Sequence, residues 1–146
     1  MVREINKSEL HALLELYTHL HETNIPEMTA HLKHTWDQIL QDQNHHIIVN
    51  EVDGKLVSSC VCVIIPNLTR GIRPYGFIEN VVTHSDYRGK GLASACVSLM
   101  LNDCEKRGIT VHWDAQNDTS RHLAEKFGYE TESVYSVYFL PRKTAD

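Results

Sequence analysis

The sequence predicts an α/β (α+β) fold in a single domain that spans residues 1–146. Two kinds of segment alternate along the chain. One has the alternating or continuous apolar pattern of β-strands, and the other has apolar residues that recur at helical spacing. A chain of 146 residues suits one domain. A fold of this size buries about 70% of the surface that its unfolded chain exposes, which is enough for one hydrophobic core.

The N-terminal part is expected to hold a short strand and two helices. Residues 2–5 form the strand candidate, and Ser8 is the expected N-cap of the helix that follows. The apolar residues of that helix are Leu10, Leu13, Leu14, Tyr17 and Leu20. The segment 24–26, which contains a proline, interrupts the pattern, and a second helix is expected over residues 29–40.

A β-hairpin is expected next, over two apolar runs at residues 46–52 and 55–65 that flank Asp53-Gly54. Asp-Gly between apolar runs is the strongest short-range signal of a hairpin. The second run is mostly apolar, which is typical of a central strand covered on both faces. A loop over residues 66–76 follows.

The second half of the chain alternates strands and helices, with glycines at the helix ends and polar residues at the helix starts. The expected elements are a strand over 77–83, a helix over 92–107 that ends at Gly108, a strand over 109–114, a helix that begins within 117–120 and ends at Gly128, and a strand over 134–140.

A glycine-rich turn links the strand over 77–83 to the helix that begins at Leu92. The first N–H groups of a helix lack internal partners, and the helix dipole places partial positive charge there. Gly89 and Gly91 allow the backbone to turn its N–H groups toward a ligand, and Arg88 and Lys90 add charge. The pattern indicates an anion-binding site, although a plain capped loop would also be compatible with it.

The segment Arg88-x-x-Gly91-x-Ala93 resembles the Gln/Arg-x-x-Gly-x-Gly/Ala signature of the GCN5-related N-acetyltransferase (GNAT) superfamily. The preceding apolar strand, the following amphipathic helix and the chain length agree with it. The resemblance implies a mixed, mostly antiparallel central sheet flanked by helices on both faces. It also implies acetyl-coenzyme A as the co-substrate that donates the acetyl group.

The resemblance assigns cofactor-binding roles by position. Backbone N–H groups of the turn would hold the pyrophosphate, the strand edge would pair with pantetheine as an added strand does, and the polar residue at the start of the last helix would reach the cofactor. The residues so assigned are Val81, Val82, Thr83, Arg88, Gly89, Lys90, Gly91, Leu92, Ala93, Ser94 and Asn117.

Glu79 is the candidate catalytic residue, as a general base that takes a proton from the attacking amine. A carboxylate in an otherwise apolar strand is expected to be buried and therefore more basic than in water. The run Ile78-Glu79-x-Val81-Val82 also resembles the glucosamine-phosphate acetyltransferase branch. That branch has acidic residues at the positions of both Glu79 and Asn80. A purely structural role for Glu79 is the alternative.

One position departs from the family pattern. Many members place a tyrosine seven residues after the residue that matches Asn117, as a general acid for the leaving thiolate, and this chain has Ala124 there. The substitute donors that the sequence offers are His84, Ser120, Tyr135 and Tyr138. The missing tyrosine is the argument for an alternative function as a non-catalytic acyl-coenzyme A-binding module. Nucleotide phosphate binding is a third interpretation.

The acceptor is expected to be a primary amine of a small molecule (an amino sugar, a polyamine or an amino-acid-like compound) or of a protein. Arg70 and Arg73 in the loop over 66–76 could clamp an anionic group of the acceptor. The other candidates for the acceptor site are His19, His21, Glu22 and Glu27.

Composition narrows the function classes. The net charge is 14 − 19 = −5, which disfavours nucleic-acid partners because these require a basic face. The four cysteines form no CxxC pair, so we expect buried free thiols and no metal. No segment resembles a signal peptide or a membrane span. We therefore expect a cytoplasmic protein without membrane contact, and the family resemblance favours a homodimer.

Overall fold

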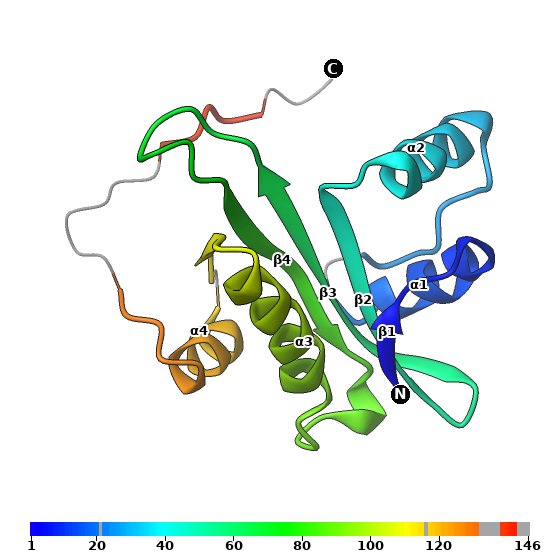
Figure 1. Ribbon diagram of the computed structural model, residues 1–146. Helices are drawn as coiled ribbons and strands as arrows, with labels where there is room; N and C mark the ends of the chain where they lie inside the picture. Colours follow the sequence, from blue (N-terminus) through cyan, green and yellow to red (C-terminus); the bar gives the residue numbers. More distant parts are fainter. Residues whose placement is uncertain (21, 116, 132–137, 143–146) are drawn as a thin grey trace.

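The computed structural model describes residues 1–20, 22–115, 117–131 and 138–142, and within these ranges five strands form one sheet in the order β1-β2-β3-β4-β5 (Figure 1). The strands are β1 (Val2–Glu4), β2 (His45–Val52), β3 (Lys55–Ile65), β4 (Tyr75–Thr83) and β5 (Thr110–Trp113). Pairing is antiparallel from β1 to β4 and parallel between β4 and β5. The prediction of a mixed, mostly antiparallel sheet is confirmed.

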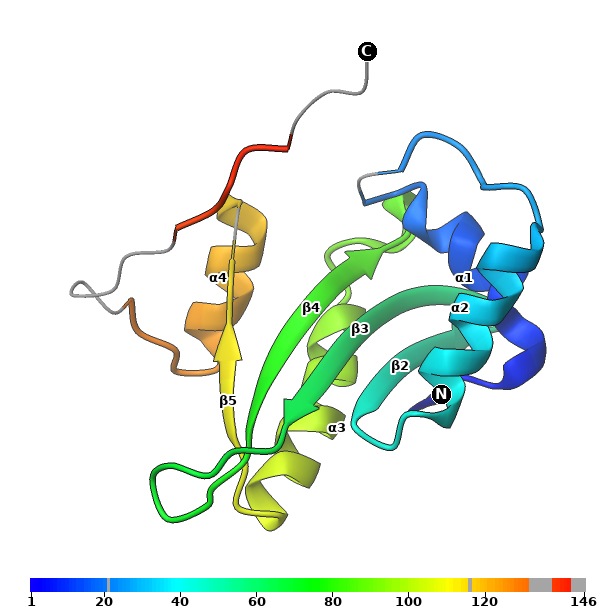
Figure 2. The same ribbon diagram turned by 90° about the horizontal axis from the view of Figure 1, so that it is seen from above.

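Helices cover both faces of this sheet. The described elements are α1 (Leu10–Tyr17), α2 (Ala30–Gln41), α3 (Leu92–Lys106) and α4 (Asp118–Lys126), with short 3-10 helices η1 (Lys7–Glu9) and η2 (Ser85–Tyr87). Figures 1 and 2 show α1 and α2 on one side of the sheet and α3 on the other. None of the helices in the described ranges is long and apolar enough to cross a membrane.

The core has two halves because side chains of a strand alternate between faces. Ile47 and Val49 of β2 pack against α1 and α2, whereas Ile48 between them packs against α3. Cys60 and Cys62 of β3 share the α3 face, and both are buried free thiols, as predicted. Burial raises the pKa of Cys62 to about 12, so the thiol stays protonated.

The hairpin between β2 and β3 has the predicted turn. Asp53 and Gly54 both have positive φ, at 50° and 78°, as a type I′ turn requires. Thr29 caps α2 by accepting a hydrogen bond from the Leu32 N–H at 3.1 Å, in agreement with the expected helix start. Local polar residues therefore set these two boundaries.

The start and the end of the first helical region differ from the prediction. Ser8 is not the N-cap, because it lies within η1, and the Glu9 carboxylate accepts the N–H of Asn6 at 2.8 Å. The helix ends at Tyr17 rather than Leu20. Each of the next three N–H groups bonds three residues back, so the chain tightens into 3-10 geometry. Of the strand expected over 134–140, residues 134–137 lie outside the part that the structure describes, and residues 138–140 are not in a strand.

Candidate active site

The strands β4 and β5 pair over only four residues and then separate (Figure 2). Their last pair joins Ile78 to Trp113, whereas β4 continues to Thr83. Residues 79–83 of β4 therefore have no β5 partner within the described chain. Such an edge of backbone N–H and C=O groups can pair with an extended ligand.

A β-bulge shapes this part of β4. Three residue steps separate Glu79 from Val82, but only two separate their partners, Val61 and Ser59. The extra residue leaves Asn80 with a φ of 48°, a conformation that asparagine tolerates better than most residues. Both Glu79 and Asn80 are exposed and line a cavity. The expected burial of Glu79 is therefore wrong, because the bulge turns this segment toward the open side.

Behind the bulge, Tyr17 of α1 lies beside Asn80. Burial raises the pKa of Tyr17 to about 12, whereas the neighbouring Asn80 side chain opposes this shift. The Tyr17 hydroxyl therefore stays protonated beside Asn80, at the position where the resembled branch has its second acid.

The glycine-rich turn presents free amides, as predicted. Gly89 and Gly91 have φ values of 77° and 73°, and a Cβ built on either would meet no heavy atom within 4 Å. The first bond of α3 runs from the Ala95 N–H to the Gly91 oxygen at 3.1 Å. Within the described chain, the N–H groups of residues 89–94 donate to no acceptor. They form a site for an anion at the helix N-terminus.

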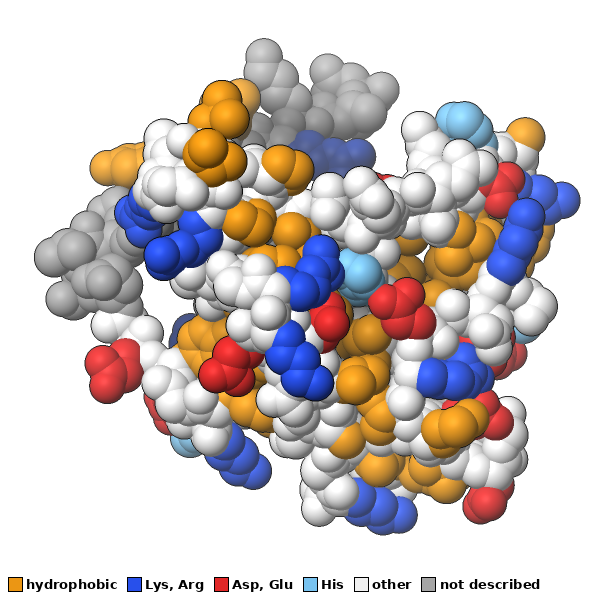
Figure 3. All heavy atoms as spheres, in the orientation of Figure 1, with side chains coloured by type: hydrophobic (Ala, Val, Ile, Leu, Met, Phe, Trp, Pro, Cys, Tyr) orange, Lys and Arg blue, Asp and Glu red, His pale blue; other side chains and the backbone are white. Residues whose placement is uncertain are grey.

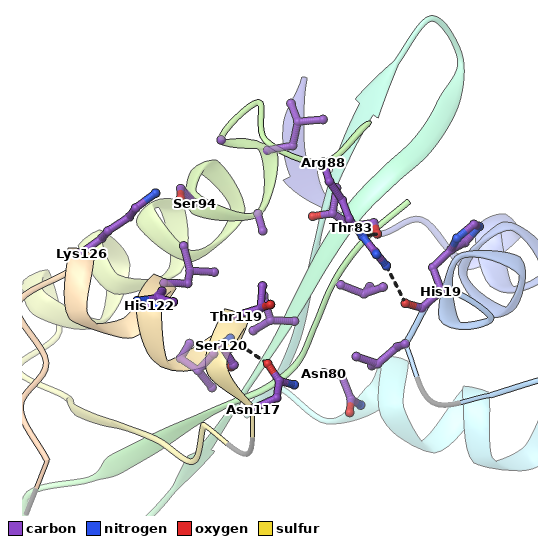
Figure 4. Close-up of a pocket in the computed structure, with 18 of the residues that line it drawn as sticks. His19, Asn80, Thr83, Arg88, Ser94, Asn117, Thr119, Ser120, His122 and Lys126 are labelled. Atoms are coloured by element: carbon purple, nitrogen blue, oxygen red, sulfur yellow. Dashed lines mark hydrogen bonds between the residues drawn. The ribbon is translucent and has the colours of Figure 1, made fainter. Parts of the chain in front are cut away.

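The two basic residues of the turn differ in position. Arg88 lines the cavity, and its guanidinium donates to the carbonyl oxygens of Thr83 at 3.2 Å and His19 at 3.1 Å (Figure 4). Lys90 does not line the cavity, and its ammonium lies 5.2 Å from the centre of the Tyr87 ring. A direct contact of Lys90 with the bound diphosphate therefore stays a prediction.

One cavity of about 700 Å³ joins the free edge of β4, the glycine-rich turn and the first half of α4. All the residues assigned to the cofactor or to catalysis line it except Lys90. The acceptor-site candidates Arg70, Arg73, Glu22 and Glu27 do not line the cavity. His21 lies outside the described residues. No group of three or more histidine, cysteine or acidic residues in the described ranges could hold a metal ion.

On the cavity wall formed by α4 and its N-cap residue, sequence reasoning assigned roles only to Asn117, as a cofactor contact, and to Ser120, as a candidate donor. The other α4 residues on that wall recur at i, i+3, i+4 and i+7 and are Thr119, His122, Leu123 and Lys126, and Figure 4 labels all of them except Leu123. This spacing is the signal that could have found them, but their mixed polarity hides it. The other lining residues that it left unassigned are Leu20, Ile78, Asn80, Tyr87, Trp113 and Asp114.

Asn117 and Ser120 form the end of this wall that lies nearest to β5. The Oδ1 of Asn117 accepts the Ser120 N–H at 2.8 Å and so caps α4 (Figure 4). One lone pair of the Asn117 Oδ1 is thereby used, and the NH₂ donors of the side chain remain available to a ligand. The Trp113 Nε1–H donates to the Ser120 Oγ at 3.3 Å.

Side chains of both charges line this site, and the basic ones are Arg88 and Lys126. On the face drawn in Figure 3, acidic and basic side chains are interspersed. The acidic residues that line the cavity are Glu79 and Asp114. Together with the amides of the turn, they give the cavity one end suited to an anion and one suited to a cation.

Comparison with known proteins finds similarity along most of the chain. A family model described as GNAT acetyltransferase matches residues 14–138. The glucosamine 6-phosphate N-acetyltransferase of Trypanosoma brucei brucei is 35% identical over 133 residues, which cover 88% of this chain and 87% of that protein.

Solved structures share the architecture as well. A crystal structure of a Trypanosoma brucei acetyltransferase superposes with a TM-score of 0.81 at 27% identity, covering 96% of this chain and 99% of that one. The glucosamine-6-phosphate N-acetyltransferase of Arabidopsis thaliana superposes with a TM-score of 0.81 at 24% identity, covering 97% and 98% of the two chains. The second likeness shows the fold alone.

Proposed function

This chain belongs to the GNAT acetyltransferase family, and from that premise we propose that it transfers the acetyl group of acetyl-coenzyme A directly to the primary amine of a small molecule. N-acetyltransferase activity follows from the family and its relatives, whereas the acceptor is our proposal. The observation that carries the proposed acetyl transfer is that a single cavity joins the unpaired amides of residues 89–94 to the unpaired edge of β4.

The donor fits the two ends of this cavity. The amides of the turn suit a diphosphate, since they supply fixed donors at a helix N-terminus. The edge of β4 over residues 81–83 suits the amide groups of pantetheine. The thioester then lies where β4 and β5 separate, and an N–H of the bulge can polarise its carbonyl oxygen as charge develops there.

The amine must lose a proton before or during its attack. Glu79 is exposed on the cavity wall, so it can accept that proton directly or through one water. Glu79 and Asp114 also place negative charge at this end of the cavity, which attracts a cationic amine. The amine nitrogen forms a bond to the carbonyl carbon, the carbon–sulfur bond breaks, and no acyl-enzyme forms.

Among amines, we propose amino sugars as the first class to test. The support is the similarity to the glucosamine 6-phosphate N-acetyltransferase of Trypanosoma brucei brucei, together with the run Ile78-Glu79-x-Val81-Val82, which resembles the glucosamine-phosphate acetyltransferase branch. Arg70 and Arg73 do not line the cavity. An acceptor phosphate held by these two arginines is therefore not part of the proposal.

The test mixes the protein with acetyl-coenzyme A and a panel of amino sugars, amino sugar phosphates, polyamines and amino acids, and measures release of free thiol. We expect at least one amino sugar to give thiol release well above the rate of thioester hydrolysis. Preference for a polyamine or a peptide amine would overturn the acceptor class. Tight coenzyme A binding without turnover on any amine would favour the binding-module function instead.

A further inference from the structure

We propose that the Ser120 hydroxyl donates a hydrogen bond to the leaving sulfur of coenzyme A, and that Trp113 holds this hydroxyl in position. The inference rests on the proposed function and deepens it, because it assigns the group that stabilises the departing thiolate. It answers the absence of the tyrosine that many relatives place at the position of Ala124.

The Ser120 hydroxyl is held so that its hydrogen is available. The indole N–H of Trp113 is a donor only, so Ser120 Oγ accepts in the 3.3 Å bond between them. No described residue accepts the hydroxyl hydrogen. Because a hydroxyl that accepts a hydrogen bond becomes a better donor, the Trp113 contact strengthens the bond that Ser120 can offer.

The hydroxyl lies where the thioester is expected. Trp113 forms the last pair of β5 with Ile78, immediately before the strands separate. Ser120 is half-buried in the first turn of α4 and lines the same cavity as the free edge of β4. Its N–H bonds to Asn117 Oδ1 at 2.8 Å (Figure 4). Backbone and side chain are thus both fixed at the point of separation.

The other candidate donors are placed less well. Ala124 is only 7% exposed and faces the core. His84 does not line the cavity, and Tyr138 is 90% exposed and does not line it either. Tyr135 lies outside the described residues. The Thr83 hydroxyl is 3.0 Å from Ser58 Oγ, at the far end of β4 from its last pair with β5.

The chemistry needs a hydrogen bond and no proton transfer from serine. As the amine nitrogen bonds to the carbonyl carbon, the electron pair of the carbon–sulfur bond moves to sulfur. An alkyl hydroxyl is a weaker acid than a thiol, so Ser120 keeps its proton and stabilises the thiolate by a charge-assisted hydrogen bond. The proton of the amine goes to Glu79 or water, and the thiolate takes its proton from water afterwards.

The test reads the thiol of bound coenzyme A and therefore needs no acceptor. The ultraviolet absorbance of the thiolate is followed against pH in the complex, with desulfo-coenzyme A as the blank. We expect Ser120→Ala to raise the pKa of the bound thiol by about one unit, equivalent to a tenfold loss of thiolate stabilisation. Ser120→Thr, which keeps a hydroxyl, should retain most of the wild-type value.

Two further variants separate positioning from simple structural damage. Trp113→Phe keeps an aromatic ring but removes the N–H. The pKa of the bound thiol should therefore rise in this variant, but by less than it rises in Ser120→Ala. Ser98→Ala removes a hydroxyl on α3 that does not line the cavity and should change nothing. With an amine that turns over, Ser120→Ala should lower kcat about tenfold with little change in KM for acetyl-coenzyme A.

The outcomes are distinct. If coenzyme A binds normally and Ser120→Ala leaves both the bound thiol pKa and kcat unchanged, the inference is overturned while the proposed function stands. If the wild-type chain does not bind coenzyme A, the proposed function is overturned and the inference with it.

Discussion

The guanidinium of Arg88 donates through Nη2 to the carbonyl oxygen of His19 at 3.1 Å and through Nε to that of Thr83 at 3.2 Å. One side chain thereby joins the end of α1, the end of β4 and the turn that precedes α3. The motif position suggested a contact with the cofactor for this arginine. In the structure it also fixes the wall formed by α1 relative to the anion site.

Replacing Arg88 should therefore affect both substrates. Arg88→Ala removes two hydrogen bonds from a charged donor, each worth about 1 kcal/mol at an exposed site. We expect coenzyme A affinity to fall about tenfold or more, measured by calorimetry, and KM for the acceptor to rise as well. Arg88→Lys should not restore either value, because an ammonium cannot match the planar fork that reaches two carbonyls. Full activity of Arg88→Lys would contradict this assignment.

Gly91 tests the anion site itself. Gly91→Glu brings a carboxylate to the N-terminus of α3, where a diphosphate would bind, and should weaken coenzyme A binding by more than a hundredfold, about 3 kcal/mol. Gly91→Ala is the matched control, because it shares the backbone strain of a φ of 73° without the charge. Titration calorimetry measures the affinity of both folded variants for coenzyme A. Equal affinities of Gly91→Glu and Gly91→Ala would refute the anion site.

The fold was predictable from the sequence where local chemistry decides the structure. Asp53-Gly54 can occupy a type I′ turn with little strain, and Thr29 caps a helix without help from distant residues. The positions that line the cavity along β4 and the turn were also predictable, because strand, glycines and helix are contiguous in the chain. The motif covers these positions.

Long-range packing decided the rest. The bulge at Asn80 arises from the register of β4 against β3, and no local pattern marks it, so Glu79 was expected to be buried. The wall from α4 is held against β5 by Trp113, whose Nε1–H donates to Ser120 and whose ring lies 6.3 Å from that of Phe127, and no local sequence pattern predicts these contacts. Arg88 gains its bond to His19 from a segment 69 residues away, a contact that a linear motif cannot show.

Glu79 is the candidate base, and its exposure makes a water-mediated role as acceptable as a direct one. Glu79→Gln should lower kcat by about a hundredfold, the lower end of what general bases contribute, while coenzyme A affinity stays within twofold. The rate of the variant should also lose the rise with pH that a carboxylate base gives. Glu105→Gln, on the exposed side of α3, is the control for loss of one charge. Identical pH–rate profiles of Glu79→Gln and wild type would exclude Glu79 as the base.

His84 should make stability depend on pH. Its ring lies against that of His19, with centroids 4.1 Å apart and planes tilted by 36°, and its Nε2 lies 3.2 Å from the Lys55 ammonium. Burial, then His19 and Lys55, lower the pKa of His84, although Asp86 opposes them and Arg88 adds to them. The unfolded chain therefore binds the proton more readily than the native one. The free energy of unfolding should fall as the pH is lowered through about 6.5, the ordinary value for histidine.

A denaturant series at several pH values measures this effect. His84→Asn keeps an acceptor for the Asp86 N–H, which His84 Nδ1 now accepts at 3.1 Å, but cannot take up a proton. Its unfolding free energy should depend less steeply on pH between about 7 and about 5. Some dependence should remain, because burial also lowers the pKa of His45. His31→Asn, on the exposed side of α2, should keep the wild-type slope. An unchanged slope in His84→Asn would show that this ring does not couple protonation to folding.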